Sequence, residues 1–183
     1  MIADRNILDD FVLKFCSIVE KHAKYIVVSG FFAIASGRTR GTEDVDIIIE
    51  QLPLEKYKLF HEELKKAGFS SMQPGTLEEI YNDYLKENLS LRYIYKGEFL
   101  PNMELKFAKD KLDEIQIENR QRYALTGLNV WFSSVNVCIA FKEGLLKSKK
   151  DLEDAQHIRL VYPNLVNEQE INKYKGLIRR YRL

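Results

Sequence analysis

The chain has 183 residues, enough to bury a hydrophobic core without the help of disulfide bonds. It carries 28 lysines and arginines against 27 aspartates and glutamates, so it has no overall positive field for a nucleic acid, and any site for a polyanion must be local. No apolar run approaches the roughly 20 residues that cross a bilayer, and the acidic N-terminus is unlike a secretory signal. We therefore expect a cytoplasmic protein that does not contact a membrane, with Cys16 and Cys138 as buried free thiols.

The first elements follow from hydrophobic spacing. Apolar residues at helical intervals predict an amphipathic helix over residues 6–22, with Asp4 as a possible cap. The segment YIVVS at 25–29 predicts a short buried strand. The small residues that follow, at 30–37, favour a helix packed closely on a sheet, and VDIIIE at 45–50 predicts the next strand.

The rest of the chain continues this alternation. Two helices and then four strands are expected before the chain becomes helical to its end, in about three segments with Pro163 before the last. These elements are a helix at 54–67 closed by Gly68, a helix at 76–87, strands at 90–96 and 102–108 separated by Gly97 and Pro101, and a strand pair within 122–134 around Gly127. The order predicts an α+β fold, a mixed β-sheet flanked by helices with a helical C-terminal segment. We expect a single domain over residues 1–183, with a core at about 23–134 and C-terminal helices at about 135–183.

Asp44 and Asp46 stand at the start of the strand that contains Ile47, Ile48 and Ile49. Residues two apart in a strand point to the same face, about 6.6 Å apart along the backbone, so the two carboxylates project together. Their repulsion, roughly 3 kcal/mol at an effective dielectric constant of 20, needs a positive partner. A divalent metal such as magnesium, which takes oxygen ligands and leaves positions for phosphate oxygens, is the usual partner.

The residues before this pair favour a phosphate site. Gly30 directly after a buried strand allows a sharp turn and the close approach of a ligand, and the helix that starts there offers free N–H groups. Ser29 adds a hydroxyl group at the same corner, and Arg40 and Thr42 come just ahead of the aspartates.

The string from Ser29 to Ile49 resembles the nucleotidyltransferase superfamily typified by polymerase beta, especially the minimal nucleotidyltransferases of bacteria and archaea, including those of toxin–antitoxin pairs. Members often have a G-x-x-R-x-T-x-D-x-D string, and the glycine usual at the first position of the corner is Ser29 here. The resemblance implies a nucleotidyltransferase fold that moves a nucleoside monophosphate from a triphosphate to a hydroxyl group, with Mg²⁺ or Mn²⁺. It also implies a metal-binding and catalytic role for Asp44 and Asp46, and nucleotide-binding roles for Ser29, Gly30, Arg40 and Thr42.

A second resemblance lies in FKEGLLKSKKDLEDAQHI, residues 141–158, which is similar to the K…KDLEDA helix pair that closes many members. Here Lys142 would meet the triphosphate as a point charge, and Asp151 would cap a helix. Helix capping and ion pairs on exposed helices explain the same residues without a ligand.

The superfamily also uses a third acid on a neighbouring strand, which completes the metal site and helps to deprotonate the acceptor. Glu104 is the best candidate, although aspartate is commoner there, and Asp110 is a weaker rival that also suits a helix cap. Glu104 shares a face with Lys106, so a surface ion pair is an alternative. Glu104-x-Lys106 also resembles metal-dependent nucleases, which would leave Gly30 and the second aspartate unexplained.

The sequence thus indicates a nucleotidyltransferase whose acceptor is a small molecule, a partner protein or an RNA end. A nucleotidyltransferase fold with weak turnover, acting in a toxin–antitoxin pair, is the alternative, and a metal-dependent nuclease is the third reading.

Overall fold

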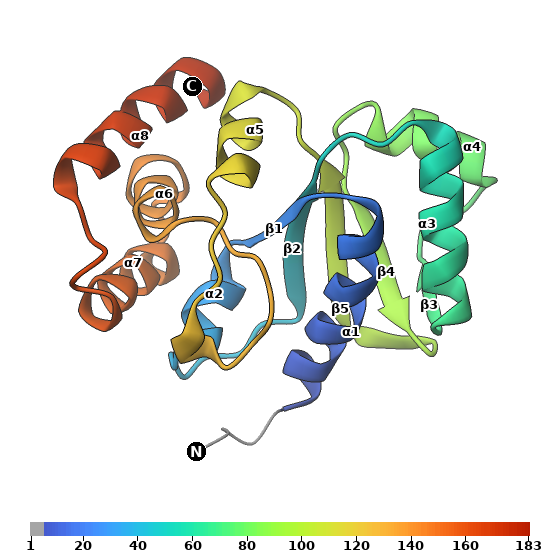
Figure 1. The fold of residues 1–183 in the computed structure, drawn as a ribbon, viewed down its shortest axis with the longest axis horizontal. Helices are drawn as coiled ribbons and strands as arrows, with labels where there is room; N and C mark the ends of the chain where they lie inside the picture. The colour runs from blue at the N-terminus through green and yellow to red at the C-terminus, as the bar shows by residue number, and fades with distance from the viewer. Residues whose placement is uncertain (1–5) are drawn as a thin grey trace.

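The computed structural model of the protein describes residues 6–183 and contains a five-stranded mixed sheet (Figure 1). The strand order is β1-β2-β5-β4-β3, with β2 and β5 parallel and the other neighbours antiparallel. The strands are β1 (Tyr25–Val28), β2 (Asp44–Ile49), β3 (Phe69–Ser71), β4 (Leu91–Tyr95) and β5 (Glu98–Phe107). The expected mixed sheet is therefore confirmed.

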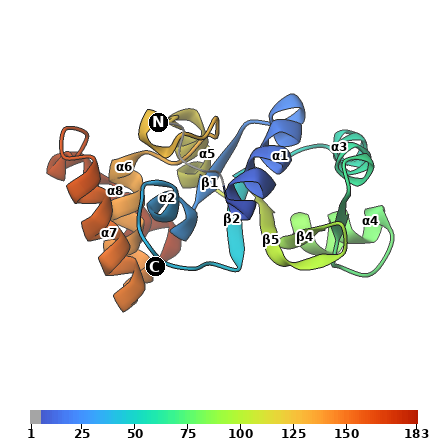
Figure 2. The ribbon, with the colours of Figure 1, turned by 90° about the horizontal axis from the view of Figure 1, so that it is seen from below.

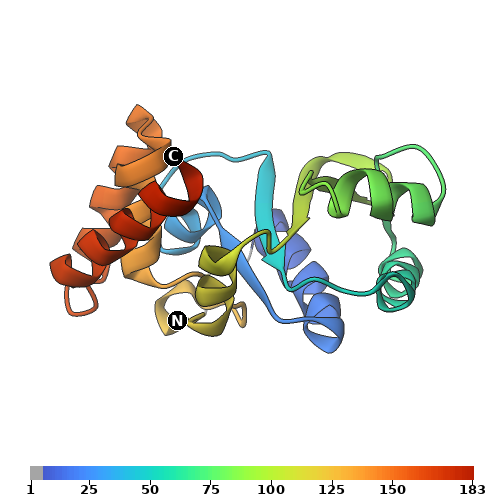
Figure 3. The same ribbon diagram turned by 90° about the horizontal axis from the view of Figure 1, so that it is seen from above.

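Helices lie around this sheet in two groups. The first group is α1 (Ile7–His22), α3 (Leu54–Lys66) and α4 (Leu77–Ile80), which continues as a π-helical turn to Leu85. The second group, side by side beyond the β1 edge, is α6 (Val135–Phe141), extended by a π-helical segment (Lys142–Leu146), α7 (Lys149–Val161) and α8 (Glu168–Arg182) (Figures 2 and 3). Two shorter helices, α2 (Gly30–Ala35) and α5 (Lys111–Glu118), connect the sheet to the second group.

The two faces of β2 differ because its side chains alternate. Val45, Ile47 and Ile49 are buried in the main hydrophobic core, which α1 and α3 cover. On the other face Ile48 packs with Ile26 of β1 in a small second apolar cluster beside α5. The polar residues of β2, Asp44 and Asp46, lie on this second face at the start of the strand.

The ends of several elements agree with the sequence patterns and others do not. Asn6 caps α1 by a reciprocal pair of hydrogen bonds with Asp9, while the expected cap, Asp4, lies outside the described residues. Asp110 caps α5, as one of the two interpretations of that residue predicted, with its carboxylate accepting from the amides of Leu112 and Asp113.

The prediction of a strand pair within 122–134 was wrong. This segment forms a short 3₁₀ turn (Ala124–Thr126) and an irregular connection, in which Phe132 alone makes isolated bridges to Val27 and Gln121. Tyr123 and Phe132 are buried because they pack on Phe32 of α2, not because they alternate across a sheet. The sequence pattern also missed β3 and α5, and it placed the start of β5 four residues late, since Pro101 lies inside that strand.

Both cysteines are free and buried, as expected. Among residues 6–183, no helix has the length and apolar character needed to span a bilayer.

Candidate active site on the open face of the sheet

The three acids singled out in the sequence lie on the same face of two adjacent strands. Asp46 pairs in register with Glu104 across the parallel strands β2 and β5, and Asp44 pairs with Asn102. Paired residues of adjacent strands point to the same side of a sheet. Asp44 is exposed, whereas Asp46 and Glu104 are half-buried. The structure therefore brings the three carboxylates to one side of the sheet, as a shared metal site would require.

Asp46 has the most perturbed environment of the three. Burial raises the pKa of its carboxyl group, and the nearby charges of Glu104 and Asp44 raise it further. The charge of Lys106 and the hydroxyl group of Ser29 oppose this rise in pKa. A carboxylate held above its ordinary pKa by burial and by like charges is stabilised by any additional cation next to it.

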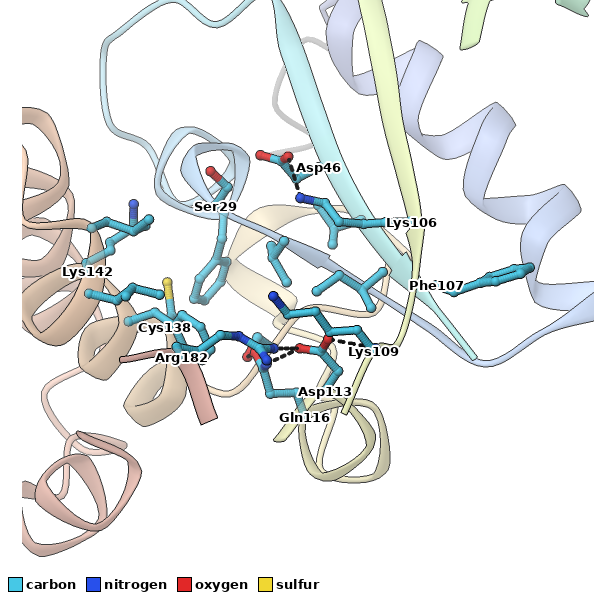
Figure 4. Close-up of a pocket in the computed structure, with 18 of the residues that line it drawn as sticks. Ser29, Asp46, Lys106, Phe107, Lys109, Asp113, Gln116, Cys138, Lys142 and Arg182 are labelled. Carbon is cyan, nitrogen blue, oxygen red and sulfur yellow. Dashed lines mark hydrogen bonds and ion pairs between the residues drawn. The ribbon is translucent and has the colours of Figure 1, made fainter. Parts of the chain in front are cut away.

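Two cationic side chains already contact these acids. Arg92 of β4 donates to Glu104 from Nε at 2.8 Å, and its Nη2 lies 2.6 Å from the same oxygen. Lys106 lies 4.0 Å from Asp46 (Figure 4). The alternative interpretation of an ion pair between Glu104 and Lys106 is thus wrong, because each of them pairs with another residue.

The donor chemistry of this face fits a divalent cation that prefers oxygen ligands. However, no three acidic, histidine or cysteine side chains within residues 6–183 are gathered in an arrangement that could hold a metal ion. Both contacts of Arg92 are on Oε1 of Glu104. The residues fit magnesium by type and by face.

The Gly30 corner is not open. The guanidinium group of Arg40 lies directly on Gly30, and a Cβ atom at this position would be 1.8 Å from Arg40 Nη2. The glycine is therefore needed for the close approach of Arg40. The expected phosphate site on the Gly30 amide is covered by the protein's own cation, which remains at the place where the phosphate was expected.

Ser29 makes the sharp turn into α2 with a backbone φ of 68° and ψ of −140°. This region is favourable for glycine and strained for serine. The strained residue is the one whose hydroxyl group lowers the pKa of the Asp46 carboxyl group. Thr42 is also used within the protein, because its hydroxyl group donates to the Asp44 carbonyl oxygen at 2.9 Å and lies 3.3 Å from its carboxylate.

Arg40 belongs to a cluster around Asp154 of α7, whose side chain is fully buried. Arg40 donates to the Asp154 carboxylate at 3.1 and 3.0 Å, and Lys142, which is 1% exposed, donates at 2.7 Å. Arg38 is the third cation on this carboxylate. Lys142, expected as a free point charge for the triphosphate, is therefore held by Asp154 and, at 3.3 Å, by Asp151.

Asp151 does not cap α7 as expected. The cap is Ser148, whose hydroxyl group accepts from the Asp151 amide at 3.1 Å. Burial raises the pKa of the Asp151 carboxyl group, but the hydrogen bonds from Ser148 and the charge of Lys142 outweigh it and lower the pKa overall.

A cavity of about 300 Å³ connects these groups. Ser29, Asp46 and Lys142 line one end, and the cavity continues between the sheet and the helical segment after α6 toward Asp113 and Arg182 (Figure 4). This volume is at the lower end of the range for small-molecule sites. Asp46, the Ser29 corner and Lys142 thus border one space.

Sequence reasoning missed Arg92 as the partner of Glu104 and Arg38 as a partner of Asp154. Arg38 lies in the G-x-x-R spacing region but faces α7, which is distant in sequence. Arg92 is opposite Glu104 in the antiparallel register of β4 and β5, so a correct hairpin register would have identified it.

No protein-family model matches the sequence, and no curated protein matches it either. Solved structures do match its fold. The antibiotic-resistance factor ANT(2'')-Ia in solution has a TM-score of 0.57 at 13% identity, over 94% of this chain and 91% of that chain.

A crystal structure of ANT(2'')-Ia in complex with adenylyl-2''-tobramycin has a TM-score of 0.56 at 15% identity, over 96% of this chain and 98% of that one. An antigenic nucleotidyltransferase-like protein from Paracoccidioides brasiliensis has a TM-score of 0.53 at 17% identity, over 93% and 87% of the two chains. The chain therefore has the α+β fold of the nucleotidyltransferases.

Proposed function

We propose that the protein transfers a nucleoside monophosphate from a nucleoside triphosphate to a hydroxyl acceptor and releases pyrophosphate. The observation that carries this proposal is the register of β2 and β5, which sets Glu104 beside Asp46, a residue that lines the cavity, in a nucleotidyltransferase fold. In the transfer, the acceptor oxygen forms a bond to the α-phosphorus and the bond from that phosphorus to the pyrophosphate oxygen breaks.

Each group has a role that its surroundings support. Asp44, Asp46 and Glu104 would hold magnesium, which supplies positive charge beside the transferred phosphate when bound. Glu104 would also orient the acceptor hydroxyl group and accept its proton. Ser29 would hold Asp46 in place, while Arg40 and Lys142 would place positive charge near the leaving pyrophosphate.

The test uses purified protein, magnesium and a cell extract as the source of acceptors, with each nucleoside triphosphate labelled at the α- or the γ-phosphate. Label from the α-position should be retained in a product and label from the γ-position should not, which separates nucleotidyl transfer from phosphoryl transfer. Asp46→Asn should lower the rate by about 100- to 1,000-fold, the range for loss of one preorganised electrostatic group. Asp83→Asn, at an exposed aspartate of another part of the chain, is the matched control.

A second candidate is a nucleotide-binding module with weak turnover, which would act as one half of a toxin–antitoxin pair. Two observations favour it. Arg92 forms an ion pair with Glu104, and the guanidinium group of Arg40 lies on Gly30. Measurable nucleotide binding without label transfer from any triphosphate would support this module against the enzyme. If Arg92→Ala then created transfer activity, the contact between Arg92 and Glu104 would be the cause of the weak turnover.

A further inference from the structure

The inner end of the cavity has a different chemistry from the end at Asp46. The cavity walls include apolar side chains, Val28 and Ile48 from the sheet and Leu145 from the helical segment after α6. Its floor is polar and consists of Gln116 and Asp113 of α5 and Arg182 at the end of α8 (Figure 4). The proposed transfer chemistry uses none of these floor residues.

The floor is built from buried, bonded groups. Gln116 and Asp113 are each 3% exposed. Gln116 Nε2 donates to Asp113 Oδ1 at 3.2 Å, and Gln116 Oε1 accepts from the Ser133 hydroxyl group at 3.2 Å. Arg182 Nη2 donates to the same Asp113 oxygen at 2.6 Å, and Arg182 also pairs with Asp110.

These bonds fix the orientation of the Gln116 carboxamide. They use one of its two N–H groups and one of the two lone pairs of its oxygen, so one donor and one acceptor remain on this cavity-lining carboxamide. The edge of every nucleobase offers a donor next to an acceptor, and its faces are flat and apolar. A phosphate group suits this end poorly, because Asp110 and Asp113 already neutralise Arg182.

We infer that the inner end of the cavity holds the nucleobase of the nucleoside triphosphate, flat between Val28 and Ile48 on one side and Leu145 on the other, with its edge against Gln116. The inference rests on the proposed function, since it takes the triphosphate to lie at the Ser29 and Lys142 end. Lys109 points into the same space from the loop after β5 (Figure 4) and supplies a second donor for the base edge.

The experiment is calorimetric titration in magnesium buffer with each of the four nucleoside triphosphates and with inorganic tripolyphosphate, which has no base. The wild-type protein should bind at least one nucleoside triphosphate roughly tenfold or more tighter than tripolyphosphate, as expected for one stacked and hydrogen-bonded base. Two variants test the location. Gln116→Leu removes the polar edge, and Leu146→Trp, at a cavity residue that is 47% exposed, fills the slot without disturbing the core.

Both variants should lose the base-dependent gain and keep the affinity for tripolyphosphate, while Gln169→Leu, at an exposed glutamine on α8, should behave as wild type. Equal binding of nucleoside triphosphates and tripolyphosphate by the wild-type protein would overturn the inference and leave the proposed function standing. Binding of neither would overturn the proposed function itself. If Leu146→Trp keeps the base-dependent gain in affinity, the base lies elsewhere. If only Gln116→Leu keeps this gain, Gln116 does not bind the edge of the base.

Discussion

Two ionic regions border the cavity, and they are organised in opposite ways. On the sheet, Asp46 and Glu104 are half-buried and each has a single cationic partner, one of them as far away as 4.0 Å. Around α7, three cations share the fully buried carboxylate of Asp154, and Asp151 and Glu153 add contacts at its edge. Loosely paired charges can exchange partners for a ligand, whereas a buried and fully bonded cluster cannot be taken apart without loss of stability.

This difference in burial and in ion pairing indicates different roles for the two regions. The acid face is the region where chemistry is expected, because its charges are incompletely compensated. The Asp154 cluster is the scaffold that ties α7 to the loop after α2 and holds Arg40 over Gly30. The four changes below test this division, from the largest expected effect to the smallest.

Asp154→Asn should lower the free energy of unfolding by about 3–5 kcal/mol, the cost of removing one partner from a buried ionic group. Three cations would then surround a neutral amide. Urea denaturation measures the loss. Glu153→Gln, at an acid with a side chain that is 48% exposed and that contacts the same Arg38, should cost about 1 kcal/mol or less. Equal losses in the two variants would show that the cluster is not the scaffold described above.

Gly30→Ala should destabilise the protein by about 1–3 kcal/mol, because its methyl group displaces the Arg40 guanidinium from Asp154. Gly176→Ala is the matched control, since the added methyl group meets no atom within 4 Å in the middle of α8 and removes a poor helix former. Thermal unfolding of the two variants should therefore shift in opposite directions. A Gly30→Ala protein as stable as wild type would mean that Arg40 moves away at no cost.

Ser29→Gly and Ser29→Ala remove the same hydroxyl group but differ in backbone freedom. Glycine tolerates the positive φ at this corner and alanine does not, so Ser29→Gly should be more stable than Ser29→Ala by about 1 kcal/mol or more. Both should lose activity to the same extent if the hydroxyl group acts on Asp46. Similar stability of the two variants would contradict the backbone strain at Ser29.

Asp46→Asn should make stability less dependent on pH. Burial raises the pKa of this carboxyl group in the folded state, so the folded protein binds the proton more tightly than the unfolded chain does. Stability from this group is present below the ordinary aspartate pKa and is lost as the pH rises through the raised folded value. The variant should therefore gain stability near neutral pH while it loses activity. The free energy of unfolding is measured between pH 3 and pH 8, with Asp83→Asn as the control. If its dependence on pH is the same in Asp46→Asn as in the wild-type protein, the titration of Asp46 does not affect stability.

Local patterns predicted most of the elements because the residues that form them are close in sequence. The period-two alternation in β2 placed Asp44 and Asp46 on the polar face, and helical spacing located α1, α3 and the three C-terminal helices. The segment at 122–134 has a strand-like composition and still forms no regular strand pair, because Tyr123 and Phe132 are buried by α2. Burial by a distant element and burial within a sheet leave the same apolar pattern in a sequence.

The sequence by itself determined that two carboxylates share a strand face behind a small-residue corner, since both follow from short-range geometry. Only the tertiary structure decided which charges pair with Glu104 and Asp154. Arg92 reaches Glu104 through the register of β4 on β5, and Asp154 gathers Arg38, Arg40 and Lys142 across more than a hundred residues of chain for the two arginines. Ion pairing depends on distance in space, and the packing of α7 against α2 and the helical segment after α6 is what sets that distance.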